Sequence, residues 1–84
     1  MIVYILATCV PGNEKEVITN IKSLPNVVEV NGVMGKYDIF IKVSADTPLT
    51  VDSSISKVRS VPHITSTLTM SAIYGQGGTI DSEK

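Results

Sequence analysis

Four hydroxyl side chains occupy every second position of a run of β-branched and apolar residues near the C-terminus: Thr65, Thr67, Thr69 and Ser71. In a β-strand this spacing places all four on one side of the chain. Such a row could offer hydrogen-bond donors and acceptors to a small polar ligand. It could also be an ordinary strand surface, because threonine is common in strands. The residues alone leave both interpretations open.

Few other residues have the type and spacing that catalysis or metal binding requires. His63 is the only histidine, and no cysteine, aspartate or second histidine has ligand or triad spacing around it. It follows a proline at a helix end, so we interpret it as a turn residue rather than a catalyst. Cys9 is the only cysteine, which excludes an internal disulfide and a CxxC pair. We predict no catalytic residue, no metal site and no cofactor.

Composition narrows the classes of partner. The chain has 84 residues, a formal net charge of −1 and seven scattered basic side chains. A chain this short is marginally stable as a monomer, which favours oligomers. The absence of a basic stripe argues against nucleic acid. Apolar runs fall short of the roughly 18 residues of a membrane span, and the N-terminus lacks a signal-peptide pattern. We therefore expect a cytoplasmic protein with no membrane partner.

A short pattern occurs twice in the chain. Lys-Ser-Leu-Pro-Asn-Val at residues 22–27 recurs as Arg-Ser-Val-Pro-His-Ile at residues 59–64, an offset of 37. Each copy follows helical spacing of apolar residues and precedes a β-branched run, which predicts a helix that ends at a proline and leads into a strand. Asn26 and His63 hold equivalent places, where we expect a positive φ.

The periodicities predict six elements in one domain, residues 1–74. They are a strand over Ile2–Cys9, a helix from Asn13 to Leu24, a strand from Val27, a strand over Tyr37–Val43, a helix from Thr47, and a strand over Ile64–Tyr74. The order β-α-β-β-α-β predicts an α+β, ferredoxin-like fold, with a four-stranded antiparallel sheet and two helices on one face. The glycine-rich residues 75–84 are expected to form a flexible tail.

The helix starts and the turn between the two middle strands are predicted from a few residues each. Asn13 with Glu16 resembles a capping box at the start of the first helix, and Thr47 followed by Pro48 predicts a cap and first position for the second. The turn between the middle strands is ambiguous. Asn31-Gly32 is a strong hairpin signal. Gly35-Lys36 gives strands of matched length and is favoured, with Gly32 as a bulge or a point of close approach.

The sheet face opposite the helices should be apolar. The first strand is apolar on both sides, and Phe40 lies opposite the Ile39 side of the third. Soluble monomers rarely expose such a patch, so we predict that a second copy covers it, sheet against sheet, in a two-fold dimer. The row that includes Thr67 and Thr69 is expected on this same face.

The chain resembles the Lrp/AsnC-type effector-binding domain, the regulation-of-amino-acid-metabolism (RAM) module, over Ile2 to Tyr74. The resemblance rests on the order and spacing of Pro11-Gly12, Leu24-Pro25 before Val27, Gly35-Lys36-Tyr37-Asp38, residues 57–62 and residues 66–70. In that family the module usually follows a DNA-binding domain. Nothing precedes the first strand here, so the chain resembles the stand-alone form of archaea and bacteria.

The resemblance implies a sheet-to-sheet homodimer, often assembled into rings, with an amino acid or similar small effector bound between dimers. It assigns ligand contacts to Gly35, Tyr37, Asp38, Thr67 and Thr69. Asp38 would pair with an α-amino group, and the two threonines with the carboxylate. A lysine stands at position 36, where the family usually has an acid, which reverses a charge beside the pocket.

We therefore interpret the chain as an amino-acid-sensing and oligomerisation module of transcription regulation, and not as an enzyme. Mixed oligomers with full-length Lrp/AsnC regulators are a further expectation, with no direct nucleic-acid contact. One rival is a small dimeric α/β-barrel enzyme on the same frame, which would need a cavity lined by a histidine, asparagine or acid. The other is a purely structural dimerisation domain.

Overall fold

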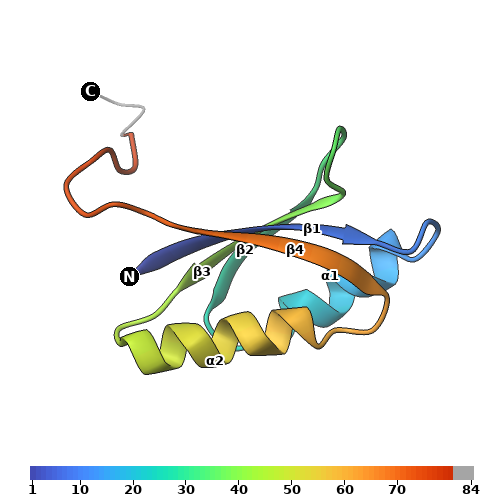
Figure 1. Cartoon of the computed structure of the whole chain (residues 1–84), viewed down its shortest axis with the longest axis horizontal. Helices are drawn as coiled ribbons and strands as arrows, with labels where there is room; N and C mark the ends of the chain where they lie inside the picture. The colour runs from blue at the N-terminus through green and yellow to red at the C-terminus, as the bar shows by residue number, and fades with distance from the viewer. Residues whose placement is uncertain (81–84) are drawn as a thin grey trace.

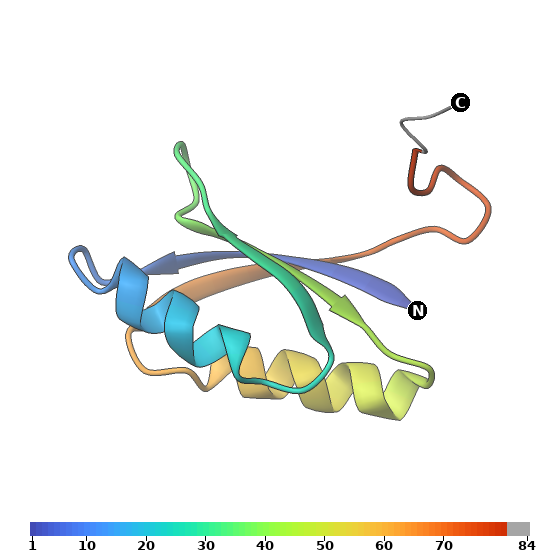
Figure 2. The same cartoon turned by 180° about the vertical axis from the view of Figure 1, so that it is seen from behind.

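The elements follow the predicted order. The computed structural model describes residues 1–80. It contains β1 (Ile2–Cys9), α1 (Glu14–Lys22), β2 (Val27–Gly32), β3 (Ile39–Ser44), α2 (Pro48–Arg59) and β4 (Ile64–Ser71). The strands form one antiparallel sheet in the order β2-β3-β1-β4, and both helices lie on the same side of it (Figures 1 and 2). The predicted ferredoxin-like α+β fold is confirmed.

The core lies between the helices and one face of the sheet. Side chains of β1 and β3 alternate between buried and half-buried, so every second one reaches the helices. The buried members are Val3, Ile5, Ala7, Cys9, Ile39, Ile41 and Val43. The rest of the core cluster is Val17 and Ile21 of α1, Val51 and Val58 of α2, and Ala45 and Val61, which lie just outside the strands and helices. Each fully buried branched side chain contributes about 1.5–3 kcal/mol, so this layer supplies most of the hydrophobic stabilisation.

The two repeated corners have the predicted conformation. Asn26 has φ 70° and His63 has φ 77°. The carbonyl of each accepts a backbone hydrogen bond from the end of a central strand, from Ser44 and from Val10 respectively, both at 2.9 Å. Asn and His tolerate the left-handed region better than most residues, and it lets the chain reverse from helix to strand within two positions.

Both helices begin where predicted, but only the second has the predicted side-chain cap. Thr47 caps α2, since its side-chain oxygen accepts from the Thr50 N–H (3.2 Å), and Pro48 follows it. Asn13 makes no side-chain cap for α1. Its φ and ψ of −102° and 9° lie outside the β region typical of a cap, and its amide donates to Glu16 Oε2 instead (3.1 Å).

The β2–β3 connection turns at Gly35-Lys36, the favoured alternative. Gly32 pairs with Ile39 in the ladder, and the Val33 N–H donates to the carbonyl of the residue before Ile39 (2.9 Å). Gly32 is therefore not a bulge, and the register shift falls between Val27 and Glu29. A Cβ on Gly32 would meet Ile18 Cδ1 at 3.5 Å, an ordinary van der Waals contact, so close approach does not require a glycine here either.

Two strand ends differ from the prediction. β3 begins at Ile39 rather than Tyr37, because the connecting loop extends that far, and β4 ends at Ser71 rather than Tyr74. Residues 75–80 of the predicted tail form no helix or strand, and its last four residues, 81–84, lie outside the described residues. Among residues 1–80, no helix is long and apolar enough to cross a membrane.

Candidate ligand-binding site

One face of the sheet is not covered by any helix of the described chain (Figures 1 and 2). We call it the free face. Its central side chains, identified by their ladder partners, are Ile2, Tyr4, Leu6, Thr8, Phe40, Lys42, Leu68 and Met70. The rings of Tyr4 and Phe40 lie 5.8 Å apart, and Leu68 and Met70 remain 44% and 42% exposed. The predicted apolar face is therefore present in the single chain.

The threonine row lies on the other side of the sheet. In the β1–β4 ladder Thr67 is opposite Ala7 and Thr69 is opposite Ile5. Side chains of directly paired residues point to the same face, and both β1 partners are fully buried under the helices. The predicted free-face position of Thr67 and Thr69 is therefore wrong. Thr67 is half-buried and Thr69 exposed, because the helices do not cover edge strand β4 completely.

A β-bulge separates Thr65 from the rest of that row. The ladder pairs Thr8 with Ser66 but Cys9 with Ile64, so Thr65 is the extra residue. The Thr8 hydroxyl contacts both the Thr65 hydroxyl (2.7 Å) and that of Ser66. Three hydroxyls carry three protons and share two contacts, so one O–H and several lone pairs stay available. This cluster lies at the border of the free face.

Asp38 extends the cluster across the sheet. It precedes Ile39, the partner of Ala7, so it adjoins Thr8 on the side away from Ser66. Its N–H donates to the Ala7 carbonyl (2.9 Å), and its Oδ2 accepts the Cys9 N–H (3.0 Å). We call Asp38, Thr8, Thr65 and Ser66 the polar row. The sequence did not single out Thr8, because its hydroxyl partners on β4 lie far along the chain and are evident only from the strand pairing.

The predicted site residues of the β2–β3 turn stay together. Gly35 has φ 135°, and a Cβ there would meet nothing within 4 Å. The glycine is thus needed for its backbone conformation. Tyr37 is half-buried and leads into Asp38, whereas Lys36 is exposed. Because β1 lies between β3 and β4, the backbones of these strands are about 10 Å apart. Within this connection it is Asp38 that belongs to the polar row, through its bond to the Cys9 N–H, whereas Thr67 and Thr69 lie on the helix side of the sheet.

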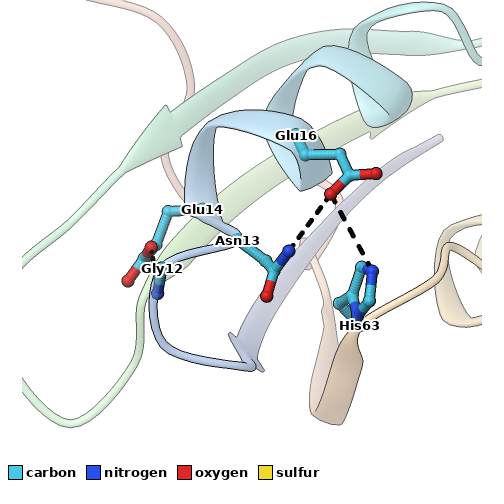
Figure 3. A network of polar contacts seen from close by, with 5 residues as sticks. All are labelled: Gly12, Asn13, Glu14, Glu16 and His63. Carbon is cyan, nitrogen blue, oxygen red and sulfur yellow. Dashed lines mark hydrogen bonds and ion pairs between the residues drawn. The ribbon is translucent and has the colours of Figure 1, made fainter.

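His63 belongs to a separate network at the start of α1 (Figure 3). Its Nε2 lies 3.8 Å from Glu16 Oε2, which also accepts from Asn13 Nδ2. The Glu14 carboxylate accepts the Gly12 N–H at 2.9 Å. His63 and Glu16 are 41% and 57% exposed, so this pair contributes little to stability. The network joins the corner after α2 to the first turn of α1. This place agrees with the interpretation of His63 as a turn residue.

Cys9 is not prepared to act as a nucleophile. It is buried, and burial raises the pKa of its thiol, with further increases from the carboxylates of Glu14 and Asp38. The thiolate, which is the reactive form, is therefore disfavoured. Within residues 1–80, no group of three or more histidine, cysteine, aspartate or glutamate side chains could hold a metal ion. A carboxylate beside hydroxyls is suited instead to binding a small polar molecule.

Fold and site together define a small α+β ligand-binding domain. Residues 2–74 match the family model described as the Lrp/AsnC ligand binding domain, and the chain belongs to this family. The HTH-type transcriptional regulator FL11 of Pyrococcus horikoshii is 29% identical over 70 residues, which are 83% of this chain and 46% of FL11. The chain thus spans about half the length of that relative.

Two solved structures agree more closely in length. The crystal structure of FFRP-DM1 has a TM-score of 0.80 and 38% identity, and the match covers 86% of this chain and 97% of that one. The hypothetical protein PHS023 from Pyrococcus horikoshii has a TM-score of 0.81 and 37% identity, with 90% and 94% covered. The matched family is described as a ligand-binding domain and FL11 as a transcriptional regulator, and neither description is that of an enzyme.

Proposed function

We propose that the chain is an amino-acid-sensing and oligomerisation module related to Lrp/AsnC regulators. The observation that carries this proposal is the polar row at the border of an apolar, uncovered sheet face. A carboxylate can accept from an α-ammonium group, and free hydroxyl protons can donate to a carboxylate. These two functions are the ones that every amino-acid ligand requires.

The proposed site has residues from the turn and from the polar row. Asp38 would hold the ammonium, and Gly35 and Tyr37 would shape the wall beside it. Thr8 and Ser66 would hold the carboxylate. Thr67 and Thr69, first assigned this role, face the helix side, so they are the second candidates for it. Lys36 adds a positive charge at the rim, which favours ligands with an acidic side chain.

Regulation would follow from linkage. The polar row opens to solvent at the edge of the free face, so a second copy packed on that face would enclose the ligand. An effector that binds the enclosed site more tightly than the open one shifts the equilibrium toward the dimer or a ring of dimers. Mixed oligomers with full-length regulators of the family are part of the same proposal. A cytoplasmic location is consistent with a lone, buried Cys9.

The experiment is native mass spectrometry of the protein alone and with each common amino acid at millimolar concentration. We expect a dimer or ring that retains one amino acid or changes size with it. At about 100 times its dissociation constant, a ligand adds about 2.7 kcal/mol of stability, so thermal melting gives an independent readout. Oligomers indifferent to every amino acid would leave the purely structural domain as the better explanation.

Two matched double variants then locate the ligand carboxylate. Thr8→Val with Ser66→Ala removes hydroxyls of the polar row, and Thr67→Val with Thr69→Val removes those of the helix side. We expect the first to weaken binding about tenfold or more and the second to leave it within about twofold, since a hydrogen bond to a charged group contributes about 1.5–3 kcal/mol. The reverse result would return the site to Thr67 and Thr69.

A further inference from the structure

The chain continues past the sheet as an arm, residues 73–80. The Ala72 N–H donates to the Ile2 carbonyl (2.9 Å), and beyond this bond the arm has one internal backbone hydrogen bond, from Gln76 to Ile73 (3.1 Å). Ile73, Tyr74 and Ile80 are 62%, 102% and 73% exposed. No residue of the arm is charged. Its three large apolar side chains are therefore almost uncovered in a single chain.

The arm leaves the sheet on the side of the free face. In Figures 1 and 2 the segment after β4, drawn in orange to red, extends away from the body on the side opposite the helices. Between the arm and the start of β1 lies an open hollow of about 780 Å³. Its sheet side includes Ile2, Tyr4 and Lys42, and Ile73 and Tyr74 border it from the arm. The hollow is thus continuous with the free face.

We propose that this arm packs against a second copy of the chain whose sheet covers the free face. The inference rests on the proposed dimer and adds a surface to it. A two-fold contact requires that one chain carry both surfaces that meet. This chain has an uncharged arm with three apolar side chains, and it has an apolar face that its own arm leaves exposed at Leu68 and Met70.

The arm adds to the apolar area that a second copy could cover. Four strands about 4.8 Å apart and six to eight residues long, at about 3.3 Å per residue, give a flat face on the order of 450 Å². A stable interface buries about 800 Å² on each partner. An aromatic side chain alone can bury about 150–250 Å². Tyr74 with Ile73 and Ile80, which are largely exposed in the single chain, therefore adds a substantial share of the area that a stable interface buries.

The test compares dimer dissociation constants by sedimentation equilibrium over a dilution series. Ile73→Ser with Tyr74→Ser, and separately a chain ended after Ala72, should each raise the dissociation constant at least about tenfold. Leu49→Ser is the matched control, because Leu49 is 80% exposed on α2, away from the free face. It should change the constant by less than about twofold. Far-UV circular dichroism checks that each variant keeps the fold.

The outcomes separate this inference from the proposed function. A dimer whose dissociation constant does not change on removal of the arm would overturn the inference and leave the dimer in place. A monomeric parent chain would overturn both. Arm substitutions that lower the melting temperature equally at every protein concentration would show that the arm covers its own sheet, which also overturns the inference.

Discussion

The carboxylate of Asp38 accepts a hydrogen bond from the backbone N–H of Cys9 at 3.0 Å. The backbone of Asp38 adds two more bonds, to the Ala7 carbonyl and from the Val33 N–H, both at 2.9 Å. One residue thus joins the end of β1 to the β2–β3 connection. In the proposed site the same carboxylate would hold the ligand ammonium, so Asp38 has a structural and a binding role that substitutions can separate.

Asp38→Ala and Asp38→Asn should differ in stability but not in ligand binding. Alanine leaves the Cys9 N–H without its acceptor, which costs about 1–3 kcal/mol in the free energy of unfolding. Asparagine keeps an acceptor oxygen and removes only the charge, so its stability should stay near that of the parent. Both should lose amino-acid binding. Urea unfolding and calorimetric titration measure the two effects, and an Asp38→Asn protein with full affinity would exclude the ammonium contact.

Substitutions at His63 should act through the backbone. His63→Val places a β-branched residue at φ 77°, where an L side chain costs about 1–2 kcal/mol, and should destabilise by that amount. His63→Asn should stay within about 0.5 kcal/mol, since asparagine occupies the same conformation at Asn26. Thermal unfolding checks both. The rival enzyme interpretation predicts instead that both variants lose function with equal severity, whatever their stability.

Cys9 should make the protein less stable at alkaline pH. Its pKa is raised in the folded state from the usual 9.0, mainly by burial. The unfolded chain therefore loses the thiol proton first, so the stabilisation is complete below pH 9 and is lost as pH rises through the folded-state pKa. Urea unfolding from pH 7 to 10.5, with Cys9→Ala as the control, should show a steeper decline for the parent. If the free energies of unfolding of the parent and of the Cys9→Ala protein declined in parallel with pH, the raised pKa of Cys9 would be contradicted.

A charge placed on the free face should prevent association without unfolding the chain. Leu68→Lys adds a cation at a position that is 44% exposed, so the monomer can solvate it. In a sheet-to-sheet dimer the same charge would be buried without a partner, which costs several kcal/mol. We expect monomers at micromolar concentration by light scattering. Leu49→Lys on the helix side should remain a dimer, and a dimeric Leu68→Lys protein would place the interface elsewhere.

The sequence predicted the fold where local chemistry determines it. Threonine before proline favours a helix start, since threonine can cap the first N–H groups and proline fits the first helical position, and the six-residue repeat marked Asn26 and His63 as equivalent corners. The turn at Gly35-Lys36 followed from matching strand lengths, and the structure gives that glycine a φ of 135°. In each case neighbours along the chain supply the constraint, so no tertiary information was needed.

The candidate site was predicted only in part, because its second half depends on the packing of an edge strand. The two alternating sets of β4 could be read from the sequence, but not which set faces the helices. Both sets are partly exposed at the sheet edge, so burial leaves no clear difference between them. The bulge at Thr65 then moves one hydroxyl out of phase with Thr67. The face of each β4 set and the position of the bulge both depend on the pairing of β4 with β1, and these two strands lie far apart in the chain.

The two halves of the chain, β1-α1-β2 and β3-α2-β4, have the same order of elements, and the 37-residue repeat makes the corner at Asn26 equivalent to the corner at His63. These corners lie at opposite ends of the sheet, since Asn26 bonds to Ser44 at the end of β3 and His63 bonds to Val10 after β1. The polar row lies at the His63 end, and at the Asn26 end the N-terminal ammonium donates to the Ala45 carbonyl (2.7 Å). One end of the sheet thus has a carboxylate and hydroxyls, and the equivalent end has the start of the chain. The near-symmetric frame is broken at the polar row, so each chain offers this set of groups once.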